Sequence, residues 1–100
     1  MNEVIRQAQV MQRKLAAAQE EMKNKTVETT AGGGMVTVVC TGDQKLKEIN
    51  IDPTLLEGGD VEMIQDLIFT AVNDALTKSN DMMEKEMSKI SGGLRLPGLF

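Results

Sequence analysis

The side chains that most often carry catalysis are scarce in this sequence of 100 residues. It contains no histidine, so the usual general base and the commonest protein ligand of metal ions are both missing. Its one cysteine, Cys40, lies in an apolar stretch with the alternation of a strand, and we expect a small core residue rather than a nucleophile. With a single cysteine, an intrachain disulfide cannot form. These residues give no support to an enzyme.

Two further segments contain residues that are typical of ligand sites, and both have simpler structural explanations. The glycines of the AGGGM stretch at 31–35 lie between two predicted strands, whereas a phosphate-binding loop leads from a strand into a helix, so we expect a hairpin turn. Asp52, Glu57 and Asp60 are close in sequence, but their spacing matches no calcium loop and each suits a turn or a helix cap. No metal, cofactor or small-molecule substrate is predicted.

The remaining chemistry is that of positive charge near the N-terminus. Arg6, Arg13 and Lys14 lie among glutamines, with only Glu3 to neutralise them before Glu20. Long cationic and amide side chains on one helix face suit contacts with phosphate oxygens. A solvated outer face of an ordinary amphipathic helix would have a similar composition. Both readings stay open at this point.

Charge is distributed unevenly along the chain. Residues 1–25 carry five cations against three carboxylates, a net +2, and residues 60–90 carry three against seven, a net −4. The total of −4 argues against a polyanion as partner. The basic front of the chain is therefore the feature on which a nucleic-acid hypothesis depends.

The first 22 residues are predicted to form the helix that positions these cations. Residues 6–22 contain no glycine or proline, and apolar residues recur at alternating spacings of four and three, which is the seam of a helix that packs lengthwise against another. Arg6 and Arg13 lie opposite this seam. The seam consists of Val4, Ala8, Met11, Leu15, Ala18 and Met22.

Alternation replaces the helical pattern from Thr26 onward. Residues 26–31, 36–42 and 44–52 read as three strands separated by glycine-containing turns, and together they predict an antiparallel meander. In the third strand, Ile49 and Ile51 are expected on one face and Leu46 on the other. Pro53 should end that strand, and residues 54–59 are expected to form a turn.

Asp60 is the predicted N-cap of a second helix that runs to about Ile90, and residues 91–100 are expected to be a flexible tail. Such a helix is ~46 Å long, whereas the strands span only ~25 Å, so half of it must extend beyond the sheet. Its apolar stripe and that of the first helix need a cover, and the simplest one is a second copy of this single domain. The predicted dimer-interface residues are Met11, Leu15, Leu76, Met83 and Met87.

Five segments together carry a resemblance over essentially the whole chain: RQAQVMQRKL, the glycine-rich link before VTV, EINIDPTLL, EMIQDLIFTAVNDAL and SGGLRLPGLF. They resemble the YbaB/EbfC family of nucleoid-associated DNA-binding proteins. The resemblance implies an α+β fold, an α-β-β-β-α protomer with a three-stranded antiparallel sheet and two long helices, and a tweezer-like two-fold dimer without catalysis. The expected DNA-binding residues are Arg6, Arg13, Lys14, Lys23 and Lys25.

Two functions remain from the sequence. The first is a homodimer that binds double-stranded DNA through its phosphates, in the cytoplasm and nucleoid, to organise the nucleoid or regulate genes. The alternative is a dimeric adaptor or chaperone-like module without DNA binding, which would grip another protein through Met82, Met83 and Met87 or through residues 94–100. The acidic total charge favours the second and the basic first helix favours the first. No apolar run is long enough for a membrane span.

Overall fold

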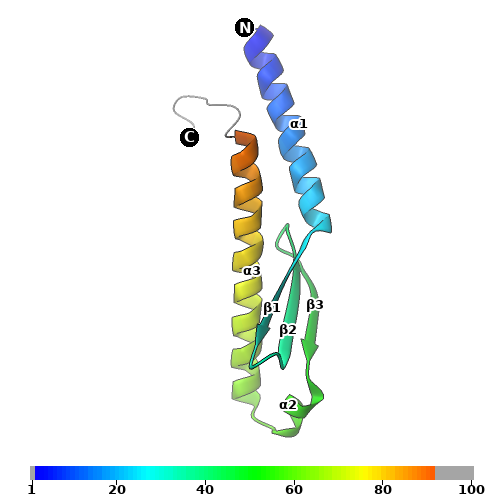
Figure 1. Ribbon diagram of the computed structural model, residues 1–100, viewed down its shortest axis with the longest axis vertical. Helices are drawn as coiled ribbons and strands as arrows, with labels where there is room; N and C mark the ends of the chain where they lie inside the picture. The colour runs from blue at the N-terminus through cyan, green and yellow to red at the C-terminus, as the bar shows by residue number, and fades with distance from the viewer. Residues whose placement is uncertain (1, 92–100) are drawn as a thin grey trace.

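Two long helices and a three-stranded sheet make up the chain in the computed structural model, which describes residues 2–91 (Figure 1). The tail was predicted at 91–100, but Ser91 is the last residue of the final helix, and residues 92–100 lie outside the described residues. The predicted α-β-β-β-α order is confirmed, with one short helix added before the last long one. The elements are α1 (Asn2–Asn24), β1 (Thr26–Ala31), β2 (Val36–Thr41), β3 (Leu46–Ile51), α2 (Pro53–Glu57) and α3 (Val61–Ser91).

The sheet is the predicted antiparallel meander, with strand order β1-β2-β3. Ala31 pairs with Val36 at the closed end of the first hairpin, and the connection passes through Gly32, Gly33 and Gly34. All three glycines have positive φ, between 64° and 93°, a region that residues with a Cβ seldom adopt. The glycine-rich stretch therefore serves the turn, as predicted.

The prediction that Leu46 lies on the opposite face from Ile49 is wrong. The register between β2 and β3 shifts between Val39 and Cys40, so that Leu46 pairs with Cys40 while Ile49 pairs with Val38. Such a bulge adds one residue to one strand and resets its alternation, which a strict period of two cannot anticipate. Directly paired residues point to the same side of a sheet, so all three apolar side chains of β3, those of Leu46, Ile49 and Ile51, lie on the face of Val38 and Cys40.

The predicted turn at 54–59 is also wrong, because its first part is the helix α2. Asp52 caps this helix, since its Oδ1 accepts hydrogen bonds from the backbone N of Thr54 at 2.9 Å and from the Thr54 hydroxyl at 2.7 Å. Pro53 takes the first helical position, where its missing N–H costs nothing and its φ is preset. The expected cap at Asp60 is confirmed by its 3.1 Å hydrogen bond from the Met63 backbone N.

The core lies between α3 and the β1–β2 half of the sheet. Val36, Val38 and Cys40 on β2 and Ala71 and Ala75 on α3 are fully buried. The small alanines allow the helix to approach the strands closely. The interpretation of Cys40 as a core residue is confirmed.

One buried hydrogen bond ties β1 to the helix above it. The Thr29 hydroxyl donates to the Ala71 carbonyl at 2.7 Å, although that carbonyl lies in the middle of α3. β3 has no comparable cover, and its inward-facing Leu46 and Ile49 stay 47% and 43% exposed. The covered and uncovered halves of the sheet therefore differ sharply.

α3 extends beyond the sheet past Ser79, and there it runs beside α1 (Figure 1). The predicted projection is thus present, but it comprises residues 80–91, 12 of the 31 residues, rather than half of the helix. The molecule is correspondingly elongated, with extents of 66 × 24 × 16 Å. Only Ala18 and Met22, both in the last two turns, are buried on α1. Val4 is 63% exposed and Met11 is half-buried, so most of the predicted seam is not covered within one chain. No helix among the described residues is long and apolar enough to cross a membrane.

Candidate nucleic-acid interface

Three cations form a basic stripe on α1, which we define as Arg6, Arg13 and Lys14. All three side chains are exposed, and none of them forms an ion pair with any described residue. Arg6 and Arg13 are seven residues apart, or ~10 Å along the helix, and therefore nearly on the same face. That separation allows the two guanidinium groups to contact different phosphates of one duplex.

α1 carries Arg6, the first residue of the basic stripe, beyond the end of α3. Met22 and Met82 both lie beside Gly42, so these two residues of α1 and α3 are level with each other. Nine further residues bring α3 to its end at Ser91, and nine residues back from Met22 bring α1 to Arg13. With the same rise per residue, Arg13 is level with the end of α3 and Arg6 projects ~10 Å past it. Figure 1 shows α1 reaching further than α3.

The other two predicted DNA-binding residues lie at the base of α1. Lys23 forms an ion pair with Glu20, with its Nζ 3.1 Å from the carboxylate, and both side chains are more than half exposed. An exposed pair of this kind contributes little energy and is readily exchanged for another anion. Lys25 is exposed between α1 and β1, and its backbone N donates to the Met22 carbonyl at 3.3 Å.

Lys45 is a further cation at the base of α1, outside the predicted set. It follows the β2–β3 turn and lies at the same end of the sheet as Lys25, because the backbone N of Gly42 donates to the Lys25 carbonyl at 2.9 Å. Its side chain is 78% exposed, with Nζ 4.0 Å from Asp43. Only strand pairing brings Lys45 near Lys25, so no local pattern in the sequence could reveal it.

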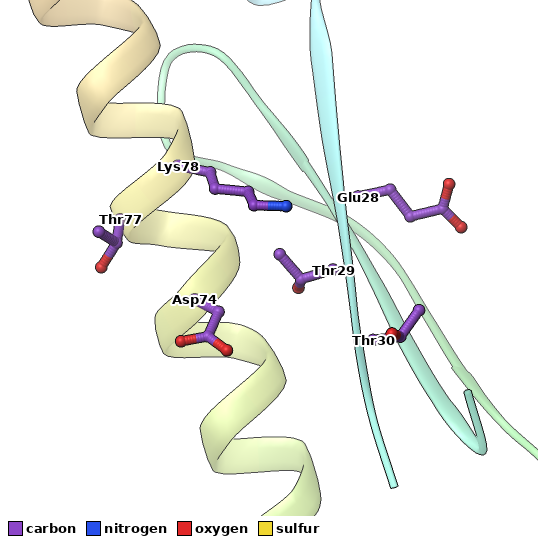
Figure 2. A pocket seen from close by; sticks show the side chains of 6 residues that line it. All are labelled: Glu28, Thr29, Thr30, Asp74, Thr77 and Lys78. Carbon is purple, nitrogen blue, oxygen red and sulfur yellow. The ribbon is translucent and has the colours of Figure 1, made fainter. Parts of the chain in front are cut away.

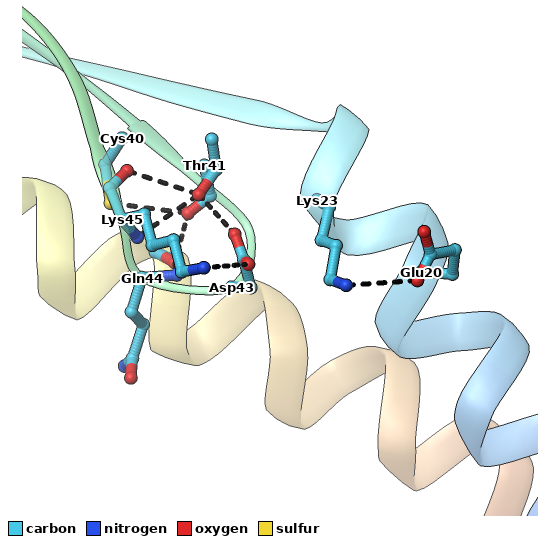
Figure 3. A network of polar contacts seen from close by, with 8 residues as sticks. Glu20, Lys23, Cys40, Thr41, Asp43, Gln44 and Lys45 are labelled. Atoms are coloured by element: carbon cyan, nitrogen blue, oxygen red, sulfur yellow. Dashed lines mark hydrogen bonds and ion pairs between the residues drawn. The ribbon is translucent and has the colours of Figure 1, made fainter.

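A polar network holds the turn that faces the base of α1 (Figure 3). The Thr41 hydroxyl donates to the Asp43 carboxylate, and this hydrogen bond lowers the pKa of Asp43, with smaller contributions from the charges of Lys45 and Lys23. The Ser79 hydroxyl of α3 donates to the Thr41 carbonyl at 2.7 Å and accepts from the Gln44 backbone N at 3.2 Å. Ser79 is fully buried, so the turn is fixed to α3.

A hollow between β1 and α3 is lined by polar and charged side chains of both signs (Figure 2). Its two carboxylates outnumber its one lysine, which makes it a poor place for a phosphate. Within residues 2–91, no group of three His, Cys, Asp or Glu side chains could hold a metal ion. The lining residues are Glu28, Thr29, Thr30, Asp74, Thr77 and Lys78.

The residues predicted for a dimer interface are partly covered by their own chain. Met11, Leu15, Leu76, Met83 and Met87 are each half-buried. Apolar side chains are more exposed in the first three turns of α3, where Phe69 is 70% and Val61 62% exposed. One chain therefore leaves apolar surface in water over both its sheet end and its helical arms.

An exposed cationic helix on an α+β body is typical of a protein that binds a polyanion, and the comparisons with known proteins give the class. The model of the YbaB/EbfC DNA-binding family matches residues 1–94, and the chain belongs to this family. Membership confirms the resemblance seen in the sequence. The family consists of DNA-binding architectural proteins rather than enzymes, which also confirms the prediction of a non-catalytic protein.

Relatives in several bacteria are similar over the whole chain. A nucleoid-associated protein of Acetivibrio thermocellus is 55% identical over 100% of this chain and 89% of its own length. One of Desulforamulus reducens is 55% identical over 100% of this chain and 95% of its own. The crystal structure of an uncharacterized Helicobacter pylori protein matches the fold with a TM-score of 0.73 at 24% identity, covering 94% of this chain and 95% of that one.

Proposed function

We propose that this protein works as a homodimer that binds double-stranded DNA through its phosphates, with the basic stripe on α1 as the main contact. The observation that carries the proposal is that Arg6, Arg13 and Lys14 are exposed and without ion pairs among the described residues, on a helix whose first residues extend past the end of α3. Family membership supports DNA as the polyanion.

The proposed dimer rests on the apolar surface that one chain leaves in water. Phe69 and Val61 on α3 and Leu46 and Ile49 on β3 are between 43% and 70% exposed, and burial of such apolar side chains would stabilise the association of two chains. Closed two-fold dimers are the commonest way to cover such a surface. A dimer would also double the basic stripe from three cations to six and hold two arms on one body.

Phosphate contact rather than base reading follows from the side chains available. The stripe offers point charges and guanidinium groups spaced along one helix, which suits a regular array of phosphates. It lacks the compact set of side chains by which a recognition helix reads base edges in the major groove. We therefore expect weak sequence preference and strong dependence on salt.

The place of action is inferred from the relatives. Both bacterial relatives described above are named nucleoid-associated proteins, and they match this chain along its whole length. We infer that this protein also acts in the nucleoid, where a dimer with two cationic arms could compact DNA or modulate local expression.

Fluorescence anisotropy with three duplexes of unrelated sequence tests the DNA proposal. Six phosphate contacts predict a slope of log K against log salt of about −5, so that affinity falls roughly a thousandfold between 50 and 200 mM salt, equally for all three duplexes. Sedimentation equilibrium at micromolar concentration should give twice the chain mass. A dimer that does not bind DNA at 50 mM salt would instead favour the adaptor function, with the methionines of α3 as the place to search for a partner.

A further inference from the structure

Among the described residues, α1 is fully buried against the rest of the protein only at its base. Ala18 and Met22 are its two buried residues, and they are four positions apart, or ~6 Å along the helix. Everything from Asn2 to Ala17 is exposed or half-buried. This buried segment is therefore the firmest anchor of α1 among the described residues, and its contacts influence the direction in which the basic stripe points.

Gly42 makes one of those contacts, at the end of α1. Its backbone N donates to the carbonyl oxygens of both Met22 and Lys25 at 2.9 Å, and thus closes the end of α1 against the β2–β3 turn. A Cβ on Gly42 would lie 2.6 Å from the Met22 carbonyl oxygen, closer than real Cβ atoms come to a backbone atom, and 2.9 Å from the Met82 methyl group. Its φ is not in the left-handed region, so close approach is the reason for glycine here.

The turn cannot easily retreat from such a clash. Ser79, buried in α3, donates to the Thr41 carbonyl at 2.7 Å and accepts from the Gln44 backbone N at 3.2 Å, so both sides of Gly42 are tied to α3. The Met82 methyl group is the end of a flexible side chain and can move at low cost. The base of α1 is left as the part that must yield.

A small displacement at the base becomes a larger one at the basic stripe. Ordinary contact begins at 3.4 Å, so the Met22 carbonyl at 2.6 Å would have to retreat by about 0.8 Å. With Ala18 as the pivot ~6 Å away, the helix would tilt by ~8° and Arg6, ~18 Å beyond the pivot, would move by ~2.4 Å. Successive phosphates of one DNA strand are about 3.4 Å apart along the helix axis, so this shift is a large part of one step.

We propose that Gly42 is a positioning residue for DNA binding, which sets the direction of α1 and thereby matches its basic stripe to the phosphates. The inference rests on the proposed function, because it assumes that α1 contacts DNA. Gly42 carries no charge and does not itself contact DNA in this proposal. It lies beside Met22, which is 16 residues, or ~24 Å along α1, from Arg6.

The test compares Gly42→Ala with Gly58→Ala. Gly58 is a matched control because its φ of −68° suits alanine and a Cβ there would meet only the Leu55 carbonyl, at an ordinary 3.6 Å. Spin labels on cysteines replacing Gln7 and the exposed Ser88 near the end of α3, in a Cys40→Ala background diluted with unlabelled protein, report the distance between α1 and α3 within one chain. A tilt moves Gln7 sideways by ~2 Å, and because these two labels are only ~14 Å apart along the helix axes, we expect Gly42→Ala to shift their distance by about 1 Å.

The same variants are then titrated with duplex DNA. One misaligned contact per protomer should make the salt slope of Gly42→Ala shallower by about two, so that the loss of affinity between 50 and 200 mM salt falls from roughly a thousandfold to roughly a hundredfold. Gly58→Ala should match the wild type in both measurements. A folded Gly42→Ala protein with an unchanged distance, or with a shifted distance and unchanged binding, would overturn the inference.

Ser79→Ala tests the same inference without a clash, in case Gly42→Ala does not fold. Loss of the tie to α3 should broaden the distribution of distances and weaken DNA binding, whereas a narrow distribution or unchanged binding would contradict a positioning role. Failure of the proposed function has a different signature, because the wild type itself would then bind DNA without salt dependence or not at all.

Discussion

Replacement of the basic stripe by glutamine is the most direct test of how this protein holds DNA. The triple substitution Arg6→Gln, Arg13→Gln and Lys14→Gln removes six charges from a dimer, and all three side chains are exposed and without ion pairs among the described residues. The fold should survive, because glutamine is a competent helix former. At about −0.9 per phosphate contact, the salt slope should become shallower by about five. The affinities for unrelated duplexes should all fall, and each by the same factor as the others.

The matched control removes the same charge elsewhere. Lys78→Gln, Lys85→Gln and Lys89→Gln also lower the net charge by three per chain, but on the acidic helix α3, where Lys89 lies 3.7 Å from Glu86. If binding depends on the basic stripe, this control should keep nearly the wild-type slope. Equal losses in both triple variants would show that only net charge matters, and an unaffected stripe variant would show that α1 presents a merely solvated face.

Three shorter predictions concern the dimer, the core and the turn. Met83→Asp should dissociate or unfold the dimer, because it would bury an unpaired charge, and a folded dimer by sedimentation would refute this. Cys40→Ala should lower the free energy of unfolding by about 1 kcal/mol in denaturant titrations and leave DNA binding intact. The pKa of Asp43 is lowered from its usual 3.8, so the ionised carboxylate should stabilise the turn at pH values above 3.8. This stabilisation should be lost as the pH falls from 3.8 through the lowered pKa, and Asp43→Asn should not show this dependence on pH.

The sequence was most informative where one period persists over many residues. The long helix after Asp60, the alternation of β2 and the glycine turn at 32–34 are all as predicted, because each follows from repeated local choices. α2 was missed because five residues are too few to show a period. Its helix depends instead on one cap and one proline, Asp52 and Pro53, which also suit a turn.

The bulge in β3 shows a different limit. Nothing in the residues near Leu46 marks the added position, since a bulge is a property of the pairing between two strands rather than of one strand. The role of Gly42 has the same origin. Its neighbours Met22 and Met82 are 20 and 40 residues away in sequence, and only the packed chain shows that a Cβ has no room between them.

The acidic net charge argued against DNA as a partner, but a total charge does not show how far apart the cations and the carboxylates lie in the folded chain. Arg6 lies ~10 Å past the end of α3, and the nearest carboxylate of that helix, Glu86, is five residues before that end. Along the helix axes the two are thus ~18 Å apart, whereas the Debye length at physiological ionic strength is about 8 Å. At that salt concentration a phosphate held by Arg6 is therefore largely screened from the carboxylates of α3. For Arg6, the projection of α1 therefore matters more than the total of −4.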